Sequence, residues 1–250
     1  MRRADRGSQP LWGPFTSRRA ATRAAIVVAE AFGLRQCSGA LLRHPDGCPL
    51  AEMGRCSAPC LDPDVDYSTI VDRVRLAMTG DVRDLTDLLA KRIAQLSTAE
   101  RFEEAAEFTN DAKEVLRATR RRSRLVSLAS CPQIVAARRD GAFWEIHVIR
   151  HGRLAGAGRC RLGTDPMPVI GAVCATAESV CPPPSGLPAC TIEEAELVAS
   201  WFEEPGVRLV DIIGEWSWPA HCWMGTYDLA ARVAALHHPG HNESDKTDGQ

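Results

Sequence analysis

Residues 84–122 read DLTDLLAKRIAQLSTAERFEEAAEFTNDAKEVLRATRRR, and this stretch predicts two antiparallel helices joined by a short turn. Apolar residues recur in its first half at intervals of three and four, which places them on one face of a helix ending near Ser97: Leu85, Leu88, Leu89, Ile93 and Leu96. Ser97 and Glu100 have the spacing of a capping box, so we expect the second helix to start there. Mostly small side chains give that helix a face for close packing: Phe102, Ala105, Ala106 and Ala112. A plain surface hairpin within a larger domain is the alternative interpretation.

Four cysteines lie upstream of this hairpin: Cys37, Cys48, Cys56 and Cys60, with ten, seven and three residues between them. Thiolates are ligands that both iron and zinc accept. Structural zinc sites are usually built from two close pairs of ligands, whereas only Cys56 and Cys60 are close here. The spacing therefore favours an iron–sulfur cluster, with a zinc site and four unrelated thiols as alternatives.

The segment from Leu11 to Cys60 resembles the part of UvrC, a component of the UvrABC excinuclease, that follows its first nuclease domain. The specific elements are Gly54-Arg55-Cys56 and Ala58-Pro59-Cys60. This resemblance implies that Cys37, Cys48, Cys56 and Cys60 bind a four-iron four-sulfur cluster.

The hairpin resembles the UVR motif of the same family. The matching residues are Phe102, Glu103, Ala105, Ala106 and Asp111, while Arg101 and Asn110 depart from the usual pattern. The resemblance implies that these matching residues bind a helical protein partner of the UvrB type.

Downstream, residues 133–160 predict three short strands, QIVAARR, FWEIHVIR and RLAGAGRC. Turn residues separate them at Asp140-Gly141 and His151-Gly152, which predicts an antiparallel meander. After a proline-rich loop we expect a helix from Ile192 to Glu203, then a strand and a helix ending near Leu236. This tail resembles the end of actinobacterial proteins that fuse a DEDDh exonuclease and a GIY-YIG nuclease to a UvrC-like region.

The residues of the nuclease domains themselves are not found. A GIY-YIG domain needs tyrosines near its start, but the tyrosines here, Tyr67 and Tyr227, follow the place where it would end. A diverged RNase H-like nuclease would need paired carboxylates, and the later acids are scattered: Asp165, Asp211, Glu215 and Asp228. We therefore expect a non-catalytic chain, with an active nuclease as the alternative.

Charge is uneven, although the net charge is only −2. Arginines cluster before the cysteines, and we expect five more to close the second hairpin helix: Arg117, Arg120, Arg121, Arg122 and Arg124. Local basic patches rather than net charge govern binding to phosphates. Arg18, Arg19, Arg121 and Arg122 are therefore the predicted DNA contacts, and a solvated helix end is the alternative.

The sequence as a whole, 250 residues with 45% hydrophobic content, predicts an α+β protein. We expect a linker helix and the four-cysteine cluster region at 1–66, a helical UVR region at 67–128, an α+β domain with the meander at 129–236 and a disordered tail at 237–250. No apolar stretch reaches the roughly 20 residues that cross a bilayer, so we expect a cytoplasmic protein with its other six cysteines reduced.

Together these features predict a non-catalytic module of nucleotide excision repair that binds an iron–sulfur cluster, a UvrB-like partner and DNA. The alternatives are an RNase H-like nuclease and a zinc-containing UVR-motif regulator.

Overall fold

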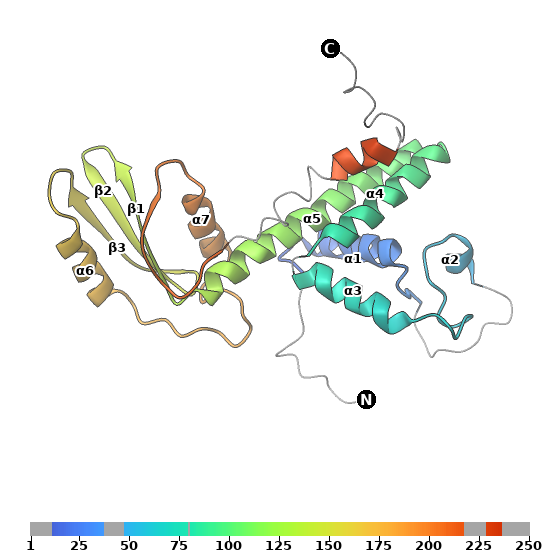
Figure 1. The fold of residues 1–250 in the computed structure, drawn as a ribbon, viewed down its shortest axis with the longest axis horizontal. Helices are drawn as coiled ribbons and strands as arrows, with labels where there is room; N and C mark the ends of the chain where they lie inside the picture. Colours follow the sequence, from blue (N-terminus) through green and yellow to red (C-terminus); the bar gives the residue numbers. More distant parts are fainter. Residues whose placement is uncertain (1–11, 38–47, 80, 218–228, 237–250) are drawn as a thin grey trace, which may run out of the picture. The chain divides into compact units, whose positions relative to one another are not determined.

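The computed structural model describes residues 12–37, 48–79, 81–217 and 229–236, and it divides into two compact units (Figure 1). Of the described residues, the helical unit contains 12–37, 48–79, 81–120 and 229–236, and the sheet unit contains 121–217. The boundary lies inside helix α5 (Phe102–Ser130), which contributes to both units. One unit is built of helices and the other around an antiparallel sheet, so the α+β prediction is confirmed.

The helical unit is formed by α1 (Arg18–Phe32), the short α2 (Pro49–Glu52), α3 (Tyr67–Thr79), α4 (Arg83–Thr98) and the first part of α5. Residues 229–236 are also helical. Helix α1 begins where the Ser17 side chain accepts a hydrogen bond from the Ala20 N–H at 3.1 Å. It ends at Gly33, which has the left-handed conformation that favours glycine.

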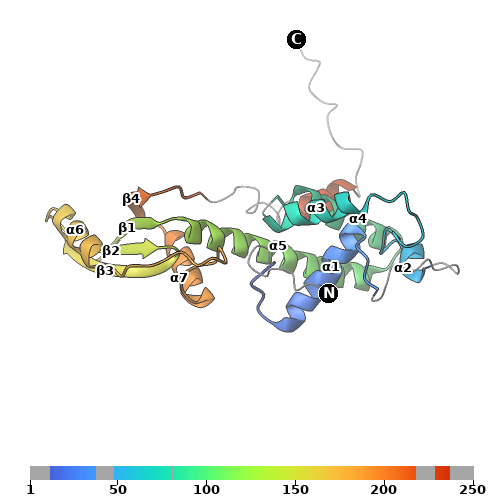
Figure 2. The same cartoon turned by 90° about the horizontal axis from the view of Figure 1, so that it is seen from below.

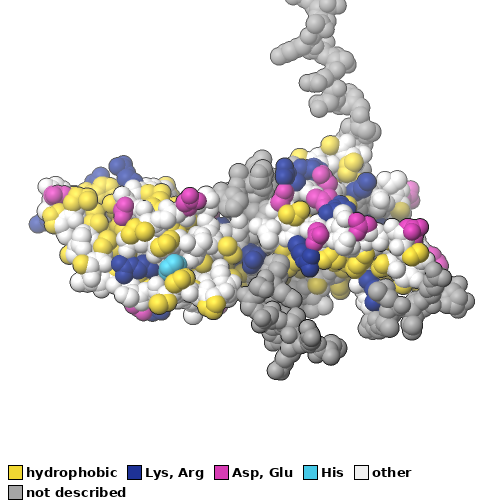
Figure 3. Space-filling model, turned by 60° about the horizontal axis from the view of Figure 1, so that its bottom comes forward, with side chains coloured by type: hydrophobic (Ala, Val, Ile, Leu, Met, Phe, Trp, Pro, Cys, Tyr) yellow, Lys and Arg dark blue, Asp and Glu magenta, His cyan; other side chains and the backbone are white. Residues whose placement is uncertain are grey.

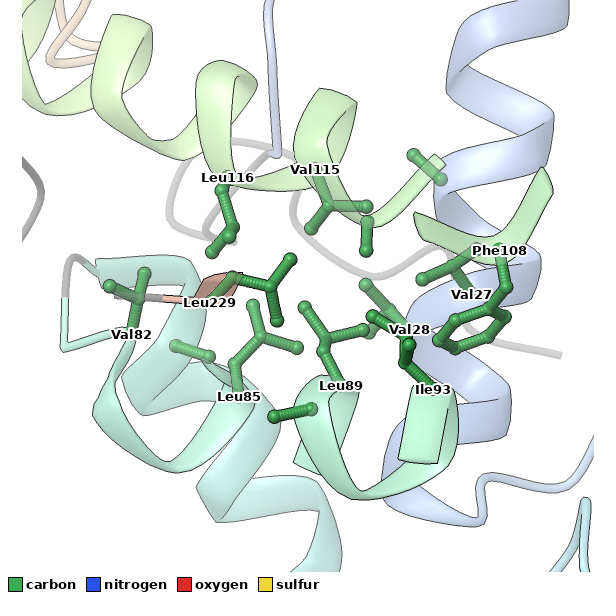
Figure 4. Packing of buried hydrophobic residues seen from close by; sticks show 14 of the residues in the cluster. Val27, Val28, Val82, Leu85, Leu89, Ile93, Phe108, Val115, Leu116 and Leu229 are labelled. Carbon is green, nitrogen blue, oxygen red and sulfur yellow. The ribbon is translucent and has the colours of Figure 1, made fainter. Parts of the chain in front are cut away.

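The predicted stripe of α4 packs into the core of this unit (Figure 4). Leu85, Leu89 and Ile93 point toward side chains from α5, α1 and the helical residues 229–236, namely Phe108, Val115, Leu116, Val27, Val28 and Leu229. Leu96 is buried as well, and Leu88 is partly buried. The hydrophobic effect thus holds the hairpin against α1 rather than leaving it as an isolated pair of helices.

The capping box predicted at the start of α5 is wrong. Ser97 lies in the last turn of α4, and Glu100 has a left-handed backbone with φ of 57°. The Glu100 N–H donates to the Ser97 carbonyl and the Arg101 N–H to the Leu96 carbonyl, both at 3.0 Å. This pair of bonds is a Schellman motif that ends α4, and α5 begins at Phe102.

The packing face predicted for the second helix is only half correct. Ala105 and Ala112 are buried, but Phe102 and Ala106 are exposed. Phe108, Val115 and Leu116 supply the larger apolar contacts of this part of α5.

The sheet unit contains the predicted meander. Its strands are β1 (Gln133–Asp140), β2 (Phe143–Arg150), β3 (Arg153–Arg161) and β4 (Arg208–Ile213), in the order β3-β2-β1-β4. All neighbouring strands are antiparallel. At the second turn both His151 and Gly152 have positive φ, of 49° and 81°, as a tight type I′ hairpin requires. Helix α7 (Ile192–Phe202) and β4 confirm the elements expected near the end of the chain.

A helix that the sequence did not predict, α6 (Met167–Thr176), lies against β3 and β2. Two glycines of β3 allow its close approach. A Cβ atom on Gly158 would lie 2.5 Å from Val173 Cγ2, and one on Gly156 would lie 3.1 Å from Ala177 Cβ. A side chain at Gly158 would collide with the helix, and one at Gly156 would force its neighbours to shift by a few tenths of an ångström.

Helices α6 and α7 cover opposite faces of the sheet (Figure 2). They contact different residues of the same strand because successive strand residues point to opposite sides of a sheet. Ile134 of β1 packs with Val198 of α7 and with Leu128 at the end of α5. Its neighbour Val135 packs in the cluster that contains Ile170 of α6.

Arg150 fastens α6 to the sheet. Its guanidinium donates to the carbonyls of Cys174, Ala177 and Glu178 at 3.1, 3.1 and 2.9 Å, and to the Gln133 side chain at 2.9 Å. A cation on the last carbonyls of a helix also suits the negative end of the helix dipole. Arg150 therefore has a structural task in this unit.

None of the helices within the described residues has the length and apolar character that crossing a membrane would require.

Candidate functional site

The four predicted ligands flank α2. Cys37 is exposed beyond α1, Cys48 precedes the first residue of α2, and Cys56 and Cys60 are half-buried in the segment that follows it. Residues 38–47, between the first two cysteines, lie outside the described part of the chain. Among the residues that are described, no three His, Cys, Asp or Glu side chains form a group that could hold a metal ion.

Arg35 interacts with both the first and the last of the four cysteines. Its Nε–H donates to the Cys37 sulfur at 3.0 Å, and the Cys60 thiol and Tyr67 hydroxyl also interact with its charge. These interactions, led by the Cys37 hydrogen bond, raise the pKa of Arg35. The Tyr67 hydroxyl in turn accepts the Arg35 backbone N–H at 2.9 Å, so α3 helps to position the residues before Cys37.

Cys56 lies in a tight turn. The Ala58 N–H donates to the Cys56 sulfur at 3.4 Å, and Ala58 has a left-handed backbone with φ of 53°. Backbone N–H groups directed at a cysteine sulfur are among the features that tune protein iron–sulfur clusters.

The end of α1 supports this turn. The Ser57 N–H donates to the Gly33 carbonyl at 2.8 Å, and a Cβ on Gly33 would lie only 3.2 Å from the same nitrogen. The Gln36 side chain also donates to the Arg55 carbonyl at 3.2 Å. The backbone on both sides of Cys56 is therefore anchored to α1 and the residues just after it.

A buried carboxylate anchors Arg55 as well. Glu30 of α1, whose side chain is 8% exposed, pairs with Arg55 at 3.0 Å and with Arg92 of α4 at 2.6 Å. Charge-assisted bonds of this kind are stronger than bonds between neutral groups, and a carboxylate this deeply buried needs such partners. The sequence motifs did not identify Glu30 and Arg92. The available signal was a glutamate among Val27, Val28 and Phe32, on the apolar side of α1.

Thiols are the donors that a thiophilic metal or cluster takes, but in this structure no three of the four cysteines come together as one group. The four thiols lie on one short segment of the chain, and two of them, Cys37 and Cys56, accept hydrogen bonds from nearby N–H groups. Backbone hydrogen bonds hold the loop around Cys56 in place in the absence of a metal. Cys37, Cys48, Cys56 and Cys60 are the residues that would hold the group.

The predicted partner-binding residues separate into two sets. Phe102, Glu103 and Ala106 are exposed at the start of α5, and Phe102 is 66% exposed. Ala105 is buried in the core, and Asp111 pairs with Arg23 of α1 at 2.9 Å. Only the first set forms an accessible surface.

The predicted DNA contacts also have different surroundings. Arg18 and Arg19 are exposed at the start of α1. Arg121 pairs with Glu196 of α7 at 2.6 Å, while burial of Arg122 lowers its pKa. The arginines from Arg117 to Arg124 do not close a helix as predicted, because α5 continues to Ser130.

The face drawn in Figure 3 shows acidic and basic side chains interspersed over the helical unit. In the sheet unit, Asp165, Asp211 and Glu215 are exposed, and Asp228 lies outside the described residues. None of the described acids belongs to a group of three side chains that could hold a metal ion.

Comparison with known proteins identifies relatives. Residues 1–77 match the middle domain of the UvrC/Cho excinucleases. A protein of Mycobacterium tuberculosis named as a bifunctional exonuclease/endonuclease is 34% identical over 206 residues, which cover 80% of this chain and 32% of that protein. UvrABC system protein C of Edwardsiella ictaluri is 32% identical over 162 residues, covering 62% of this chain and 26% of the relative.

The UvrABC system protein C of Proteus mirabilis is 28% identical over 152 residues, covering 58% of this chain and 25% of the relative. The chain thus spans about a third or less of the length of these relatives. No solved structure matches it. With the UvrC/Cho middle domain over residues 1–77 and similarity to UvrC continuing beyond it, the chain is a relative of the UvrC proteins.

Proposed function

We propose that this chain is a non-catalytic module of nucleotide excision repair that acts in the cytoplasm. In this proposal it binds a four-iron four-sulfur cluster through Cys37, Cys48, Cys56 and Cys60, and a UvrB-like protein through the helical hairpin. The match of residues 1–77 to the UvrC/Cho middle domain carries the proposal, because those residues include all four cysteines.

The cluster would serve as a structural cross-link. A bound cluster supplies four iron–sulfur bonds that fix the distances between its ligands. The chain's own contribution is to hold Cys56 in a turn anchored to Gly33 and Glu30. Iron is favoured over zinc by the spacing of the cysteines, with only one close pair.

The partner surface would be the exposed start of α5. Phe102 leaves most of its ring in water, with Glu103 and Ala106 exposed beside it. Exposed aromatic side chains commonly anchor helical partners, because burying the ring on binding removes a large apolar area from water.

Arg18 and Arg19, exposed at the first turn of α1, are the better placed of the proposed DNA contacts, since Arg121 already pairs with Glu196.

The first experiment is anaerobic purification followed by an ultraviolet–visible spectrum and measurement of iron, sulfide and zinc. The variant Cys56→Ser, Cys60→Ser removes two proposed ligands, and Cys181→Ser, an exposed cysteine of the sheet unit, is the matched control. We expect about four irons per chain and a broad visible band in the wild type and the control, lost in the double variant. One zinc and no colour would favour the zinc-containing UVR-motif regulator instead, and no metal in any form would contradict both.

The second experiment measures binding of a UvrB-type UVR hairpin peptide by calorimetry. Phe102→Ala should weaken binding about tenfold or more, as expected for loss of an aromatic anchor. Leu197→Ala removes another highly exposed apolar side chain from α7 and should leave binding unchanged. Equal affinities for Phe102→Ala and the wild type would rule out this surface.

A further inference from the structure

Glu30 contacts both the segment that carries the cysteines and the helical hairpin, which have separate roles in the proposed function. On one side it pairs with Arg55, the residue immediately before Cys56, at 3.0 Å. On the other side it pairs with Arg92 of α4, the first helix of the hairpin, at 2.6 Å. We infer that Glu30 is a positioning residue that couples occupancy of the cysteine site to the stability of the hairpin. This inference rests on the proposed function, because it requires a metal group at the cysteines.

The contacts form a short and continuous connection. Cys56 is covalently next to Arg55, and only the Glu30 carboxylate separates the guanidiniums of Arg55 and Arg92. Each oxygen of Glu30 has its own arginine, since Oε2 accepts from Arg55 and Oε1 accepts from Arg92. A carboxylate bound on both oxygens cannot rotate to favour one partner without losing the other.

Burial makes this connection effective. The side chain of Glu30 is 8% exposed, while its partners Arg92 and Arg55 are 19% and 33% exposed, so the carboxylate itself is largely withdrawn from water. In such surroundings, a guanidinium that withdraws leaves a carboxylate short of hydrogen bonds. The position of Arg55 therefore affects how firmly Arg92, and with it α4, is held against α1.

The same region brings four elements together around one cavity of about 270 Å³. Its lining includes Ile26 of α1, Met53 and Arg55 between α2 and Cys56, Arg92 of α4 and Phe108 of α5. The carboxyl of Glu104 on α5 also interacts with the charges of Arg55 and Arg92, and its pKa is lowered, chiefly by a hydrogen bond from Arg101. Both hairpin helices thus face the residue that precedes Cys56.

A metal group bound to Cys56 and Cys60 would restrict the motion of the backbone at Arg55. Arg55 would then remain on Glu30 for a larger fraction of time, and Glu30 would hold Arg92 more firmly. Because coupling between two sites is reciprocal, a partner that stabilises the hairpin would also tighten binding of the metal group.

Hydrogen–deuterium exchange of the α4 amides tests this coupling, with Zn²⁺ as a probe that any thiolate site accepts. Metal content is measured in parallel, and Cys56→Ser, Cys60→Ser identifies zinc bound elsewhere. In the wild type, one zinc at the cysteine site should slow exchange in α4 about fivefold or more, the lower end of common coupling factors.

The decisive variant is Arg92→Gln, which cuts the connection on the hairpin side and leaves Arg55 paired with Glu30. It should bind zinc as the wild type does but show no slowing in α4. The matched control is Arg73→Gln, which removes the pair that joins α3 to Asp84 of α4 at 2.8 Å and does not touch the cysteine segment. This control should keep the response to zinc even if its exchange is faster throughout.

An equal response to zinc in Arg92→Gln and the wild type would overturn the coupling, and so would a wild type that binds zinc without any change in α4. Both of these results leave the proposed function intact. Failure of the wild type to bind any metal at the four cysteines would instead overturn the proposed function and the coupling together.

Discussion

Glu100 adopts a backbone conformation that is costly for any residue with a side chain. Its φ of 57° closes the Schellman motif between α4 and α5, a position where glycine is the usual residue. The hydrogen bonds of the motif involve the backbone alone, so they do not depend on the glutamate side chain.

Replacing Glu100 by glycine should therefore stabilise the protein. Relief of left-handed strain outweighs the greater entropy of glycine in the unfolded chain, so we expect a gain of about 0.5–1 kcal/mol. Urea denaturation measures the change. The control is Glu107→Gly, at an exposed position inside α5, which should instead lower stability by about 1 kcal/mol. A loss of stability in both variants would show that the backbone of Glu100 is not strained.

Asp66 makes the stability of α3 depend on pH. Hydrogen bonds from the Ser68 and Thr69 hydroxyls and from the Thr69 N–H lower the pKa of this carboxyl to about 2. Because its pKa is lower in the folded state than in the unfolded chain, the stabilisation is complete above pH 4. It is lost as the pH falls through 2.

Asp66→Asn should accordingly lower the thermal midpoint above pH 4, and its difference from the wild type should shrink toward pH 2. Thermal unfolding followed by circular dichroism from pH 5 to pH 2 checks this dependence. Asp64→Asn, a neighbouring exposed acid, serves as the control and should show no such convergence. A constant difference between Asp66→Asn and the wild type across this range would refute it.

At the scale of elements, the contact between α6 and β3 depends on the absence of a side chain. Gly158→Ala should cost about 1–3 kcal/mol, because the new methyl group would lie 2.5 Å from Val173 Cγ2. The same substitution at Gly171, inside α6 with open space around it, should raise stability by up to about 1 kcal/mol. Chemical denaturation of both variants provides the measurement, and effects of the same sign would be inconsistent with this packing.

Most elements of the fold could be predicted because their signals are local. The turn residues Gly141 and Gly152 mark the ends of the strands, and the spacing of Leu85, Leu89 and Ile93 identifies α4. Helix α6 was missed for a physical reason. Its sequence MPVIGAVCAT has no polar face and contains a glycine, so periodicity could not distinguish it from a strand or loop.

The errors at the hairpin have a different origin. Sequence spacing places Phe102 and Ala106 on one side of a helix, but only the position of α1 decides which side is buried. A left-handed glutamate has no sequence signature, so the turn at Glu100 looked like a capping box. The four cysteines were evident from the sequence, whereas the Glu30 contacts required α1 and α4 to be placed in space.

At the scale of the whole molecule, each unit has a separate hydrophobic core. Leu89 is fully buried in the helical unit, and Ile149 is 1% exposed in the sheet unit. Leu89→Ala should cost the helical unit about 2–5 kcal/mol, and Ile149→Ala should cost the sheet unit a similar amount.

Hydrogen exchange resolved along the chain distinguishes the two effects. Leu89→Ala should speed exchange mainly in α1, α4 and the first half of α5, and Ile149→Ala mainly in β1, β2 and β3. Uniform acceleration over all of these elements in both variants would show instead that the two units unfold as one.

The division between the units inside α5 has a consequence for how such chains can be recombined during evolution. A genetic crossover between the codons for Arg120 and Arg121 would sever a 29-residue helix. It would leave about four carbonyls on one side and four N–H groups on the other without helical partners. Exchange of either unit between genes is therefore expected to include the whole of α5. The exchanged segment would then be longer than the compact unit itself.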